Sequence, residues 1–515
     1  MTVAPVPPAP EIPDIDLATF TLAKAESLGD KPALIDGPTG RTITFAEYGR
    51  QVQQLAGALA ARGIGKGDVV AIYMPNLPEY AVLFQGVLRA NATNTTANPL
   101  YTARELGHQL TDSGAKLIFT IAPFLDTARE AAEHAGINDI VVVGESEGNE
   151  PSLADLLEED APAPEIDIDP ATDLAVLPYS SGTTGLPKGV MLTHRNLIAN
   201  VLQIDEVFQI TEDDVLVGCL PFFHIYGQTV IMNLGLRNGA TVVTLPRFDL
   251  DQFLSLIAEH GITLANIVPP IALALAKHPA VDEADLSSLR LIMSGAAPLG
   301  AELSAAVSDR LNVPTIQGYG MTETSPVTHI SPTDPDRIKG GSIGLPVPGT
   351  ESRLVDPDTG EDGTRGELWI RGPQVMAGYL NNEEATKHTI DDEGWLHTGD
   401  IGEIDDDGYY AIVDRLKELI KYNGFQVPPA ELEAILITHP AIADCAVIGV
   451  PDEGAGELPK AFVVVSGEVS DDEIMSFVAE QVSPQKRLRL VERIEEIPKS
   501  AAGKILRKDL RARAD

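Results

Sequence analysis

The sequence predicts an α/β protein with a large N-terminal domain of two α/β subdomains plus a small β unit, followed by a small α+β C-terminal domain. Its 515 residues exceed what one compact core holds and indicate roughly three units. The hydrophobic fraction of 44%, with glycine and proline spread along the chain, argues against a disordered or fibrous protein. Helical and strand-like segments alternate through the first half, which predicts parallel sheets covered by helices.

The first subdomain is predicted from a capping box and the apolar segments that follow it. Thr44 and Glu47 have the spacing of a capping box, so a helix should begin there and end near Gly63. A strand, a helix and a second strand are then expected at residues 69–74, 79–88 and 115–120.

The same pattern resumes after the acidic, proline-containing stretch 158–170. A helix is expected to begin near Thr193. Strands are expected at residues 174–177, 215–220 and 241–245. Because the stretch 158–170 lies between two α/β regions, it is interpreted as a surface connection near a subdomain boundary.

Past Gly349 the character changes to short strands separated by turns. This part of the chain predicts a small β unit with strands at 351–355, 366–371 and 409–413. The last hundred residues predict the α+β domain, with a helix at 428–437, strands at 444–450, 461–465 and 488–494, and a helix capped by Ser470 with Glu473.

Charge and composition limit the possible partners and location. Acidic residues outnumber basic ones by 76 to 37, and a net charge of −39 repels polyanions, so nucleic acid is not expected as a partner. The excess of acidic residues indicates either a surface that favours solubility or an organism with a salty cytoplasm. Cys219 and Cys445 are expected to be reduced core residues. Residues 1–13 lack the pattern of a signal peptide and no apolar run could span a membrane, so we expect a cytoplasmic protein without stable membrane insertion.

The loop at 179–189 is the most informative segment. It places three glycines, four Ser or Thr hydroxyls and Lys188 directly after an apolar strand. Glycines let backbone N–H groups approach an anion, while the hydroxyls and the lysine add donors and charge. The loop does not align with a Walker motif, and a flexible polar turn would not require this whole string. It therefore predicts a phosphate site.

This loop resembles the phosphate loop of the adenylate-forming superfamily, which includes acyl-CoA synthetases, luciferases and nonribosomal adenylation domains. Further motifs of that superfamily follow in the expected order across nearly the whole chain. The resemblance implies ATP, Mg²⁺ and CoA as cofactors. It assigns ATP binding within the loop to Ser180, Ser181, Gly182, Thr183, Thr184, Gly185 and Lys188, with Thr183 also near the metal.

Two later motifs resemble the rest of the nucleotide site. In the segment 318–323, the resemblance places Tyr319 near adenine, Thr322 on the α-phosphate and Glu323 on Mg²⁺. The glycines on either side of Tyr319 are interpreted as a turn. In the segment 395–400, Asp400 would bind the ribose. The remaining nucleotide positions implied by the resemblance are Ala296, Gly318, Gly320, Met321, Ile412, Arg415 and Lys504.

The C-terminal part resembles the mobile domain of the superfamily. Lys417 would be its hinge, with the N-terminal domain at 1–414 and the C-terminal domain at 415–515. Lys504 would bridge the acid's carboxylate and the α-phosphate, because a fixed cation stabilises charge where two anions meet. The resemblance assigns CoA binding to Lys421, Gly424 and Phe425, and Asn423 stands where many relatives carry lysine.

The strings 220–227, 293–299 and 325–327 most resemble those of bacterial 4-coumarate–CoA ligases. The acid pocket implied by this resemblance consists of His224, Tyr226, Met293, Gly295, Ala296, Gly320, Pro326 and Val327. His224 would also serve catalysis. Met293 is apolar where the plant enzymes carry a lysine, so we expect tolerance of unsubstituted cinnamate or other apolar acids.

The expected function is an AMP-forming carboxylate–CoA ligase acting on 4-coumarate- or cinnamate-type aryl acids. A medium-chain fatty acyl-CoA synthetase shares every nucleotide motif and is the nearest alternative. A nonribosomal adenylation domain and a luciferase-like oxygenase are more remote. A nucleotide-binding scaffold without catalysis is disfavoured because the expected reactive positions carry suitable side chains. The partners are the acid, ATP and CoA, and the chain should be a monomer or homodimer.

Overall fold

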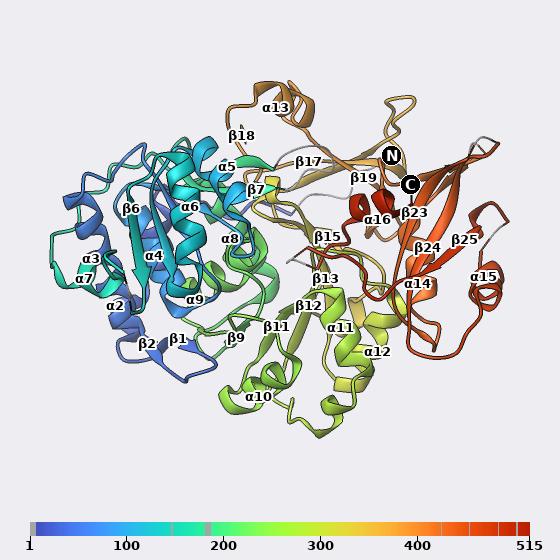
Figure 1. Ribbon diagram of the computed structural model, residues 1–515, viewed down its shortest axis with the longest axis horizontal. Coiled ribbons are helices and arrows are strands. Elements are labelled where there is room, and N and C mark those ends of the chain that lie inside the picture. The colour runs from blue at the N-terminus through green and yellow to red at the C-terminus, as the bar shows by residue number, and fades with distance from the viewer. Residues whose placement is uncertain are drawn as a thin grey trace.

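The computed structural model describes residues 7–145, 148–180, 187–423, 425–452, 454–482, 484–500 and 503–514. Four sheets organise these residues (Figure 1). The first runs in the order β15 (Leu345–Pro346), β14 (Val327–Ile330), β13 (Thr315–Gly320), β12 (Leu291–Ser294), β11 (Leu264–Ile267), β9 (Val215–Gly218), β10 (Thr241–Thr244), β1 (Pro32–Asp36) and β2 (Thr42–Thr44). The second runs β18 (Gly378–Tyr379), β8 (Lys188–Thr193), β7 (Leu174–Ser180), β4 (Thr93–Thr96), β3 (Val69–Tyr73), β5 (Ala115–Ile121) and β6 (Asp139–Val143).

The two remaining sheets belong to the later part of the chain. The third is the antiparallel β16 (Glu351–Val355), β17 (Arg365–Arg371), β19 (Leu396–Ile404) and β20 (Tyr410–Arg415). The fourth, at the right of Figure 1, is β22 (Phe425–Val427), β21 (Ile420–Tyr422), β24 (Gly456–Val465) and β23 (Ile442–Asp452), with β25 (Leu490–Arg493) paired to β24.

Helices cover these sheets. They are α1 (Leu17–Thr21), α2 (Ala25–Leu28), α3 (Phe45–Ala61), α4 (Pro78–Arg89), α5 (Ala103–Ser113), α6 (Leu125–Ala135), α7 (Leu153–Glu158), α8 (His194–Phe208), α9 (Leu234–Asn238), α10 (Leu250–His260), α11 (Pro269–Lys277), α12 (Ala301–Leu311), α13 (Glu383–Thr389), α14 (Pro429–Leu436), α15 (Asp471–Ala479) and α16 (Arg507–Ala514).

Local signals set the helix starts. The capping box of Thr44 and Glu47 opens α3, whose C-cap Arg62 is followed by Gly63 at φ +77°, as expected. A second capping box, of Ser470 and Glu473, opens α15. Thr193 accepts from the backbone of Asn196 at the start of α8.

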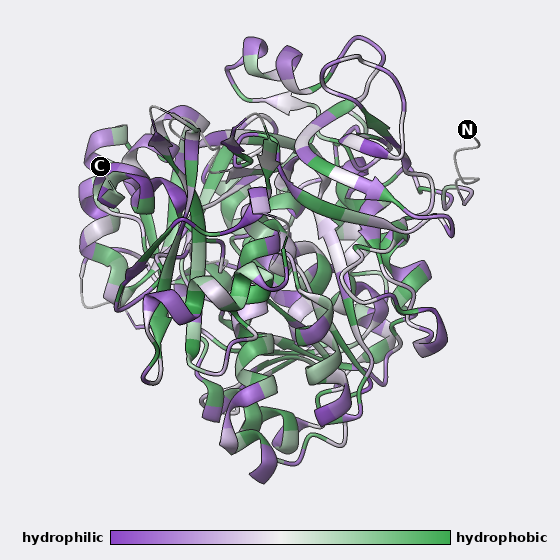
Figure 2. Cartoon of the chain, turned by 90° about the vertical axis from the view of Figure 1, so that its right-hand side faces the viewer, coloured by the Kyte–Doolittle hydropathy of each residue, from purple (hydrophilic) through white to green (hydrophobic). Residues whose placement is uncertain are grey.

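One core joins the first two sheets. It includes Val70 of β3, Val176 of β7, Leu216 of β9 and Ile292 of β12. Figure 2 shows the strands as largely hydrophobic and the outer helices as mixed. The domain built on the fourth sheet has hydrophobic clusters of its own, one of which contains Leu432 of α14. The expected large N-terminal and small C-terminal α/β arrangement is confirmed.

The subdomain boundary expected near residues 158–170 is wrong. The strands on either side of this stretch, β6 and β7, belong to the same sheet. Ala161 lies directly against Gly57 of α3, so the stretch packs on an earlier helix. The chain instead moves between the first two sheets at other places, because β1 and β2 join the first sheet while β3 to β8 build the second.

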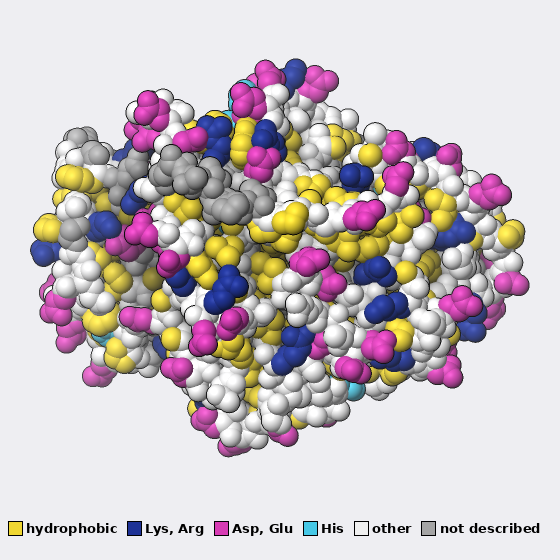
Figure 3. Space-filling view, turned by 180° about the vertical axis from the view of Figure 1, so that it is seen from behind, with side chains coloured by type: hydrophobic (Ala, Val, Ile, Leu, Met, Phe, Trp, Pro, Cys, Tyr) yellow, Lys and Arg dark blue, Asp and Glu magenta, His cyan; other side chains and the backbone are white. Residues whose placement is uncertain are grey.

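Two expectations for the chain after residue 317 also differ from the structure. Residues 318–320 form the end of strand β13 and not a turn; a side chain on Gly320 would collide with the carbonyl of Pro326. Strand β19 was not expected at all, although it carries Asp400. No helix within the described ranges is long and apolar enough to cross a membrane. In Figure 3, acidic side chains are distributed over the face shown instead of gathering in one patch.

Candidate active site

The candidate site lies where the first two sheets meet the C-terminal domain. In the first sheet, β9, β11, β12 and β13 run parallel, so their carboxyl ends share one edge. The segments after these strands carry His224, Ala296 and Thr322. Strand β7 of the second sheet ends at Ser180. Ligands of open α/β sheets bind outside the carboxyl ends of the strands, which makes this edge the expected place for chemistry.

Glu323 is held by residues from two other segments. Its side chain is buried, with the residue 6% exposed, and Oε1 accepts hydrogen bonds from Ser180 Oγ at 3.0 Å and Tyr379 Oη at 2.8 Å. The Lys188 ammonium lies 4.1 Å from the centre of the Tyr379 ring. Tyr379 was not expected from the sequence. It connects the end of the phosphate loop to the carboxylate.

Asp400 is the centre of a second polar group. Tyr319 Oη donates to Asp400 Oδ2 at 2.6 Å, and Arg415 Nε lies 3.1 Å from Asp400 Oδ1. Asp400 and Arg415 face each other across β19 and β20, which explains why residues fifteen apart meet. Burial, and then the charge of Asp400, raise the pKa of Tyr319 well above its usual value. Ile412 packs with Tyr319 against one hydrophobic cluster of the third sheet.

Lys504 reaches this region from the C-terminal domain. Burial, and then the neighbouring charge of Arg415, lower the pKa of the Lys504 ammonium to about 8, while Asp400 and Glu323 act in the opposite direction. The preceding Gly503 has φ +77°, and a side chain there would meet Val268 Cγ2 at 3.2 Å. A glycine therefore suits both the backbone and the close approach.

The Lys504 loop is anchored within its own domain. Arg507 makes two hydrogen bonds to the carboxylate of Glu433, at 2.6 and 2.7 Å. Ser500 and Lys504 also bond through their backbones, with Ser500 N donating to Lys504 O at 2.8 Å. These bonds anchor the backbone on either side of the Lys504 side chain.

His224 lies near the lysine in a partly buried position. Burial, and then the charge of Lys504, lower the pKa of His224 to about 4, so the imidazole is neutral at physiological pH. Its Nδ1 accepts from the Tyr226 backbone N–H at 3.2 Å. The ring is therefore oriented by its own loop.

The residues expected to form the acid pocket come from β12, β13, β14 and the segments that follow β9, β12 and β13. Tyr226 Oη donates to the Met293 carbonyl at 3.3 Å, and the Tyr226 ring occupies the space that a side chain on Gly295 would need. Met293 Cε lies 2.6 Å from where a Cβ on Gly318 would be. The other expected pocket residues are Ala296, which has φ +68°, Gly320, Pro326, and Val327, whose N–H donates to Asn200 Oδ1 at 3.0 Å.

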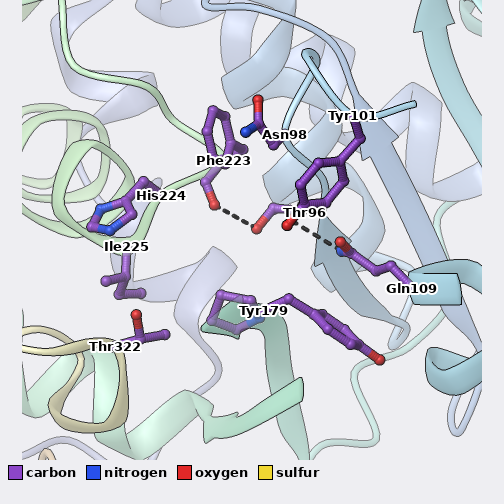
Figure 4. Close-up of a pocket in the computed structure, with 10 residues that line it drawn as sticks. Thr96, Asn98, Tyr101, Gln109, Tyr179, Phe223, His224, Ile225 and Thr322 are labelled. Atoms are coloured by element: carbon purple, nitrogen blue, oxygen red, sulfur yellow. Dashed lines mark hydrogen bonds between the residues drawn. The ribbon is translucent and has the colours of Figure 1, made fainter. Parts of the chain in front are cut away.

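A cleft adjoins His224 and Thr322 on the side of the second sheet (Figure 4). Gln109 Nε2 donates to the Thr96 carbonyl, and Thr96 Oγ1 donates to the Phe223 carbonyl. The sequence motifs include one half of this cleft, whereas its other residues come from β4, α5 and the segments beside them and belong to no motif. Its lining residues are Thr96, Asn98, Tyr101, Gln109, Pro178, Tyr179, Phe223, His224, Ile225 and Thr322.

The expected CoA-binding residues that the structure describes are exposed. Lys421 is exposed, and Phe425, on the adjoining strand, is 54% exposed. Lys417 lies between β20 and β21. Several expected ligand residues fall outside the described residues, namely Ser181, Gly182, Thr183, Thr184, Gly185 and Gly424.

The residues present fit a magnesium ion bound together with phosphates. Mg²⁺ in nucleotide sites uses one or two carboxylates and takes its other ligands from phosphate oxygens and water. Glu323 supplies one carboxylate, and its Oε1 already bonds to two hydroxyls that fix its orientation. Within the described part of the chain no group of three or more His, Cys, Asp and Glu could hold a metal by itself.

Residues 22–380 match the AMP-binding enzyme family, and residues 431–504 match the AMP-binding enzyme C-terminal domain. The chain belongs to the AMP-binding enzyme family. This AMP-binding enzyme is 47% identical to 4-coumarate–CoA ligase 3 of Oryza sativa subsp. japonica, over 98% of this chain and 94% of that one. It is 46% identical to 4-coumarate–CoA ligase 1 of Petroselinum crispum, over 98% and 96%.

Solved structures agree with this membership. The anthranilate CoA ligase in complex with anthranoyl-AMP superposes with a TM-score of 0.91 at 29% identity, over 100% of this chain and 99% of that one. ATP-bound MatB from Rhodopseudomonas palustris superposes with a TM-score of 0.87 at 32% identity, over 97% and 99%. The expected superfamily and fold are thus confirmed.

Proposed function

We propose that this AMP-binding enzyme is an ATP-dependent acid–CoA ligase that converts coumarate- or cinnamate-type aryl acids to acyl-AMP and then to acyl-CoA. The observation that carries the proposal is the position of the partly buried Lys504 near Arg415, Asp400 and Glu323. A cation from the C-terminal domain thereby meets two carboxylates of the N-terminal domain, next to Arg415 at the junction of the two domains, where an anionic nucleotide and an anionic acid would come together.

The first half-reaction follows from these positions. A carboxylate cannot acylate a thiol directly, because its leaving group would be oxide, so ATP supplies AMP as the leaving group. The acid's oxygen attacks the α-phosphorus, the bond to pyrophosphate breaks, and acyl-AMP forms. Lys504 stabilises the charge that concentrates between the two anions, and Thr322 hydrogen-bonds the α-phosphate. Asp400 and Arg415 bind the ribose, with Tyr319 against adenine.

Lys188, Ser180 and the rest of the phosphate loop would hold the departing pyrophosphate. Glu323 would bind Mg²⁺, with Thr183 near it. The ion, when bound, neutralises charge on the pyrophosphate leaving group. Tyr379 contributes by holding the Glu323 carboxylate at 2.8 Å.

The second half-reaction requires a thiol to reach the carbonyl of acyl-AMP. The thiolate attacks that carbon and AMP leaves, which yields the thioester. We propose that the C-terminal domain, residues 415–515, turns on the hinge at Lys417 relative to residues 1–414. The turn would withdraw Lys504 and bring Lys421, Gly424 and Phe425 to the site as part of the CoA tunnel. The present exposure of Phe425 supports this step.

The assignment of the acid rests on the pocket and on the relatives. His224 and Tyr226 would flank an aromatic ring, and neutral His224 would not compete with Lys504 for the carboxylate. The 4-coumarate–CoA ligases named above match nearly the whole chain. Met293 adds an apolar wall, so cinnamate should be accepted. A monomeric or homodimeric state and a cytoplasmic location stay predictions.

ATP–pyrophosphate exchange over a panel of aryl and straight-chain acids, followed by thioester formation with CoA, tests this function. We expect exchange and acyl-CoA with 4-coumarate and cinnamate. Preference for a medium-chain fatty acid would replace the aryl assignment by the fatty acyl alternative. Absence of ATP–pyrophosphate exchange with every acid would contradict the ligase function and favour a nucleotide-binding scaffold without catalysis.

A further inference from the structure

The strand that carries Asp400 bulges away from its neighbour at this residue. Strand β17 pairs with β19 at Glu367 and again at Trp369, with one residue between them. On β19, three residues, 398–400, lie between the corresponding partners. Gly399, within the bulge, has φ +71°, a conformation that favours glycine. A bulge redirects the side chains that it carries, so the geometry of this one sets the direction of the Asp400 carboxylate.

The carboxylate of Glu367 holds this bulge. Its Oε1 accepts a hydrogen bond from the Gly399 N–H at 2.9 Å, and its Oε2 accepts one from Trp369 Nε1 at 2.9 Å. The Gly399 carbonyl accepts a hydrogen bond from the Leu416 N–H at 2.9 Å. Both peptide units that flank Gly399, the second of which leads into Asp400, are therefore tied to neighbouring segments.

The indole that supports Glu367 is fixed in turn by stacking. The rings of Trp369 and His397 are inclined by 13°, with their centres 3.8 Å apart. The guanidinium carbon of Arg353 lies 5.2 Å from the centre of the Trp369 ring. These three residues are cross-strand partners on β16, β17 and β19. Because His397 directly precedes the bulge, one row of side chains fixes both the support of Glu367 and the start of the bulge.

Gly399 cannot hold itself in the way that its neighbour does. Thr398 Oγ1 donates to the Leu368 carbonyl at 2.7 Å and accepts from the Asp400 N–H at 3.1 Å. Gly399 has no side chain, and apart from its chain neighbours no atom of the described residues lies within 4 Å of where its Cβ would be. On the side of β17, its position therefore depends on the bond to Glu367.

We propose that Glu367 is a positioning residue for ribose recognition, which orients Asp400 through Gly399 so that the carboxylate binds both ribose hydroxyls of the nucleotide. The inference rests on the role of Asp400 in the function proposed above. A carboxylate accepts about four hydrogen bonds, and Tyr319 and Arg415 occupy one oxygen each from one side. A contact with two hydroxyls at once tolerates little rotation of the carboxylate. Loosening the bulge should therefore weaken the distinction between ribose and deoxyribose.

Pyrophosphate exchange with ATP and with 2′-deoxyATP measures this distinction. Wild-type kcat/KM should favour ATP by about tenfold, because the deoxynucleotide lacks one hydrogen bond to a charged acceptor. Glu367→Leu should reduce the ratio to about two, mainly through a higher KM for ATP, with the KM for the acid unchanged. Glu403→Leu alters an exposed glutamate on the same strand as Asp400, so it is the matched control and should keep the wild-type ratio.

A binding readout avoids dependence on the acid. The thermal unfolding midpoint of the wild type should rise more with AMP than with 2′-deoxyAMP, and the two rises should be nearly equal in Glu367→Leu. A general loss of stability would lower every midpoint without changing this difference. If the leucine variant does not fold, Glu367→Gln, which keeps one of the two acceptor oxygens, should give ratios between those of the wild type and one.

The two readouts separate this inference from the proposed function. Wild-type ratios in the folded Glu367 variants would overturn the role of Glu367 and leave the ligase function standing. Absence of exchange with every acid, together with the expected change in AMP binding, would overturn the ligase function and leave the role of Glu367 standing. Equal binding of AMP and 2′-deoxyAMP by the wild type would overturn the ribose contact of Asp400 and this inference with it.

Discussion

Two segments of the C-terminal domain have opposite surroundings. The loop that carries Lys504 docks against Val268 and brings its ammonium among Arg415, Asp400 and Glu323. The hairpin of β21 and β22 points its Phe425 ring largely into solvent. Both segments belong to one domain with its own sheet, so a rigid movement that buries one withdraws the other. The difference supports the proposal that the two half-reactions use different faces of the same domain.

The largest expected effect on activity concerns the loop that carries Lys504. Lys504→Ala should slow ATP–pyrophosphate exchange by about a hundred- to a thousandfold, as the loss of one preorganised group at a developing charge does elsewhere. Thioester formation from supplied acyl-AMP should be spared, because the thiol step does not use this ammonium.

Lys508→Ala is the matched control, since Lys508 is an exposed lysine four residues further on. It should leave both half-reactions at wild-type rates. Equal losses of both half-reactions in Lys504→Ala would contradict the division of labour between the two segments.

The exposed segment gives the complementary prediction. Phe425→Ala should leave exchange unchanged and slow thioester formation by about tenfold, because an aromatic wall of the thiol path is lost. Single-turnover acyl transfer from acyl-AMP to CoA measures this step. Leu490→Ala removes another exposed apolar side chain of the same domain and should change neither rate. A loss of rate confined to ATP–pyrophosphate exchange would contradict the assignment of Phe425 to the thiol step.

The charge of Lys504 should also be visible in the pH profile. Adenylation needs the ammonium form, and the pKa of Lys504 in the free enzyme is lowered to about 8. The value of kcat/KM for ATP in exchange should therefore fall as pH rises through 8, and be about tenfold lower at pH 9 than at pH 7. If the same fall persists in Lys504→Ala, another group is responsible.

The smallest effect is expected at Tyr379, which acts through Glu323. Tyr379→Phe removes the 2.8 Å hydrogen bond but keeps the ring under Lys188 and the Ser180 bond. The KM for MgATP should rise about threefold with little change in kcat, because one neutral donor to the carboxylate is lost. Tyr409→Phe, which loses a hydroxyl bonded to the Arg337 carbonyl, is the control. A larger effect on kcat than on KM would assign Tyr379 to the chemistry itself.

Local signals in the sequence predicted much of the fold. The capping box at Thr44 and the one at Ser470 each open a helix, because the bonds that form them lie within four residues. The boundary expected near 158–170 failed for the opposite reason. Which sheet a strand joins depends on contacts between residues distant in sequence. Strand β6 precedes that stretch and β7 follows it, yet both belong to the second sheet.

The candidate site shows the same limit. Asp400, Arg415 and Lys504 could be selected from motifs, and the structure brings them together. Tyr379 belongs to a two-residue strand 56 positions from Glu323, and nothing in its surroundings signals the contact.

The position of Lys504 beside Arg415 has a further consequence. Desolvation and the like charge of Arg415 outweigh the attraction of Asp400 and Glu323 on the Lys504 ammonium, so the docked loop carries an electrostatic cost that an anionic nucleotide offsets. In the proposed cycle, departure of pyrophosphate removes much of that compensation. The repulsion then returns and favours release of the domain. The enzyme would thus sense the completion of its first step as a change in local charge, and the residue that stabilises the transition state would also time the movement that follows.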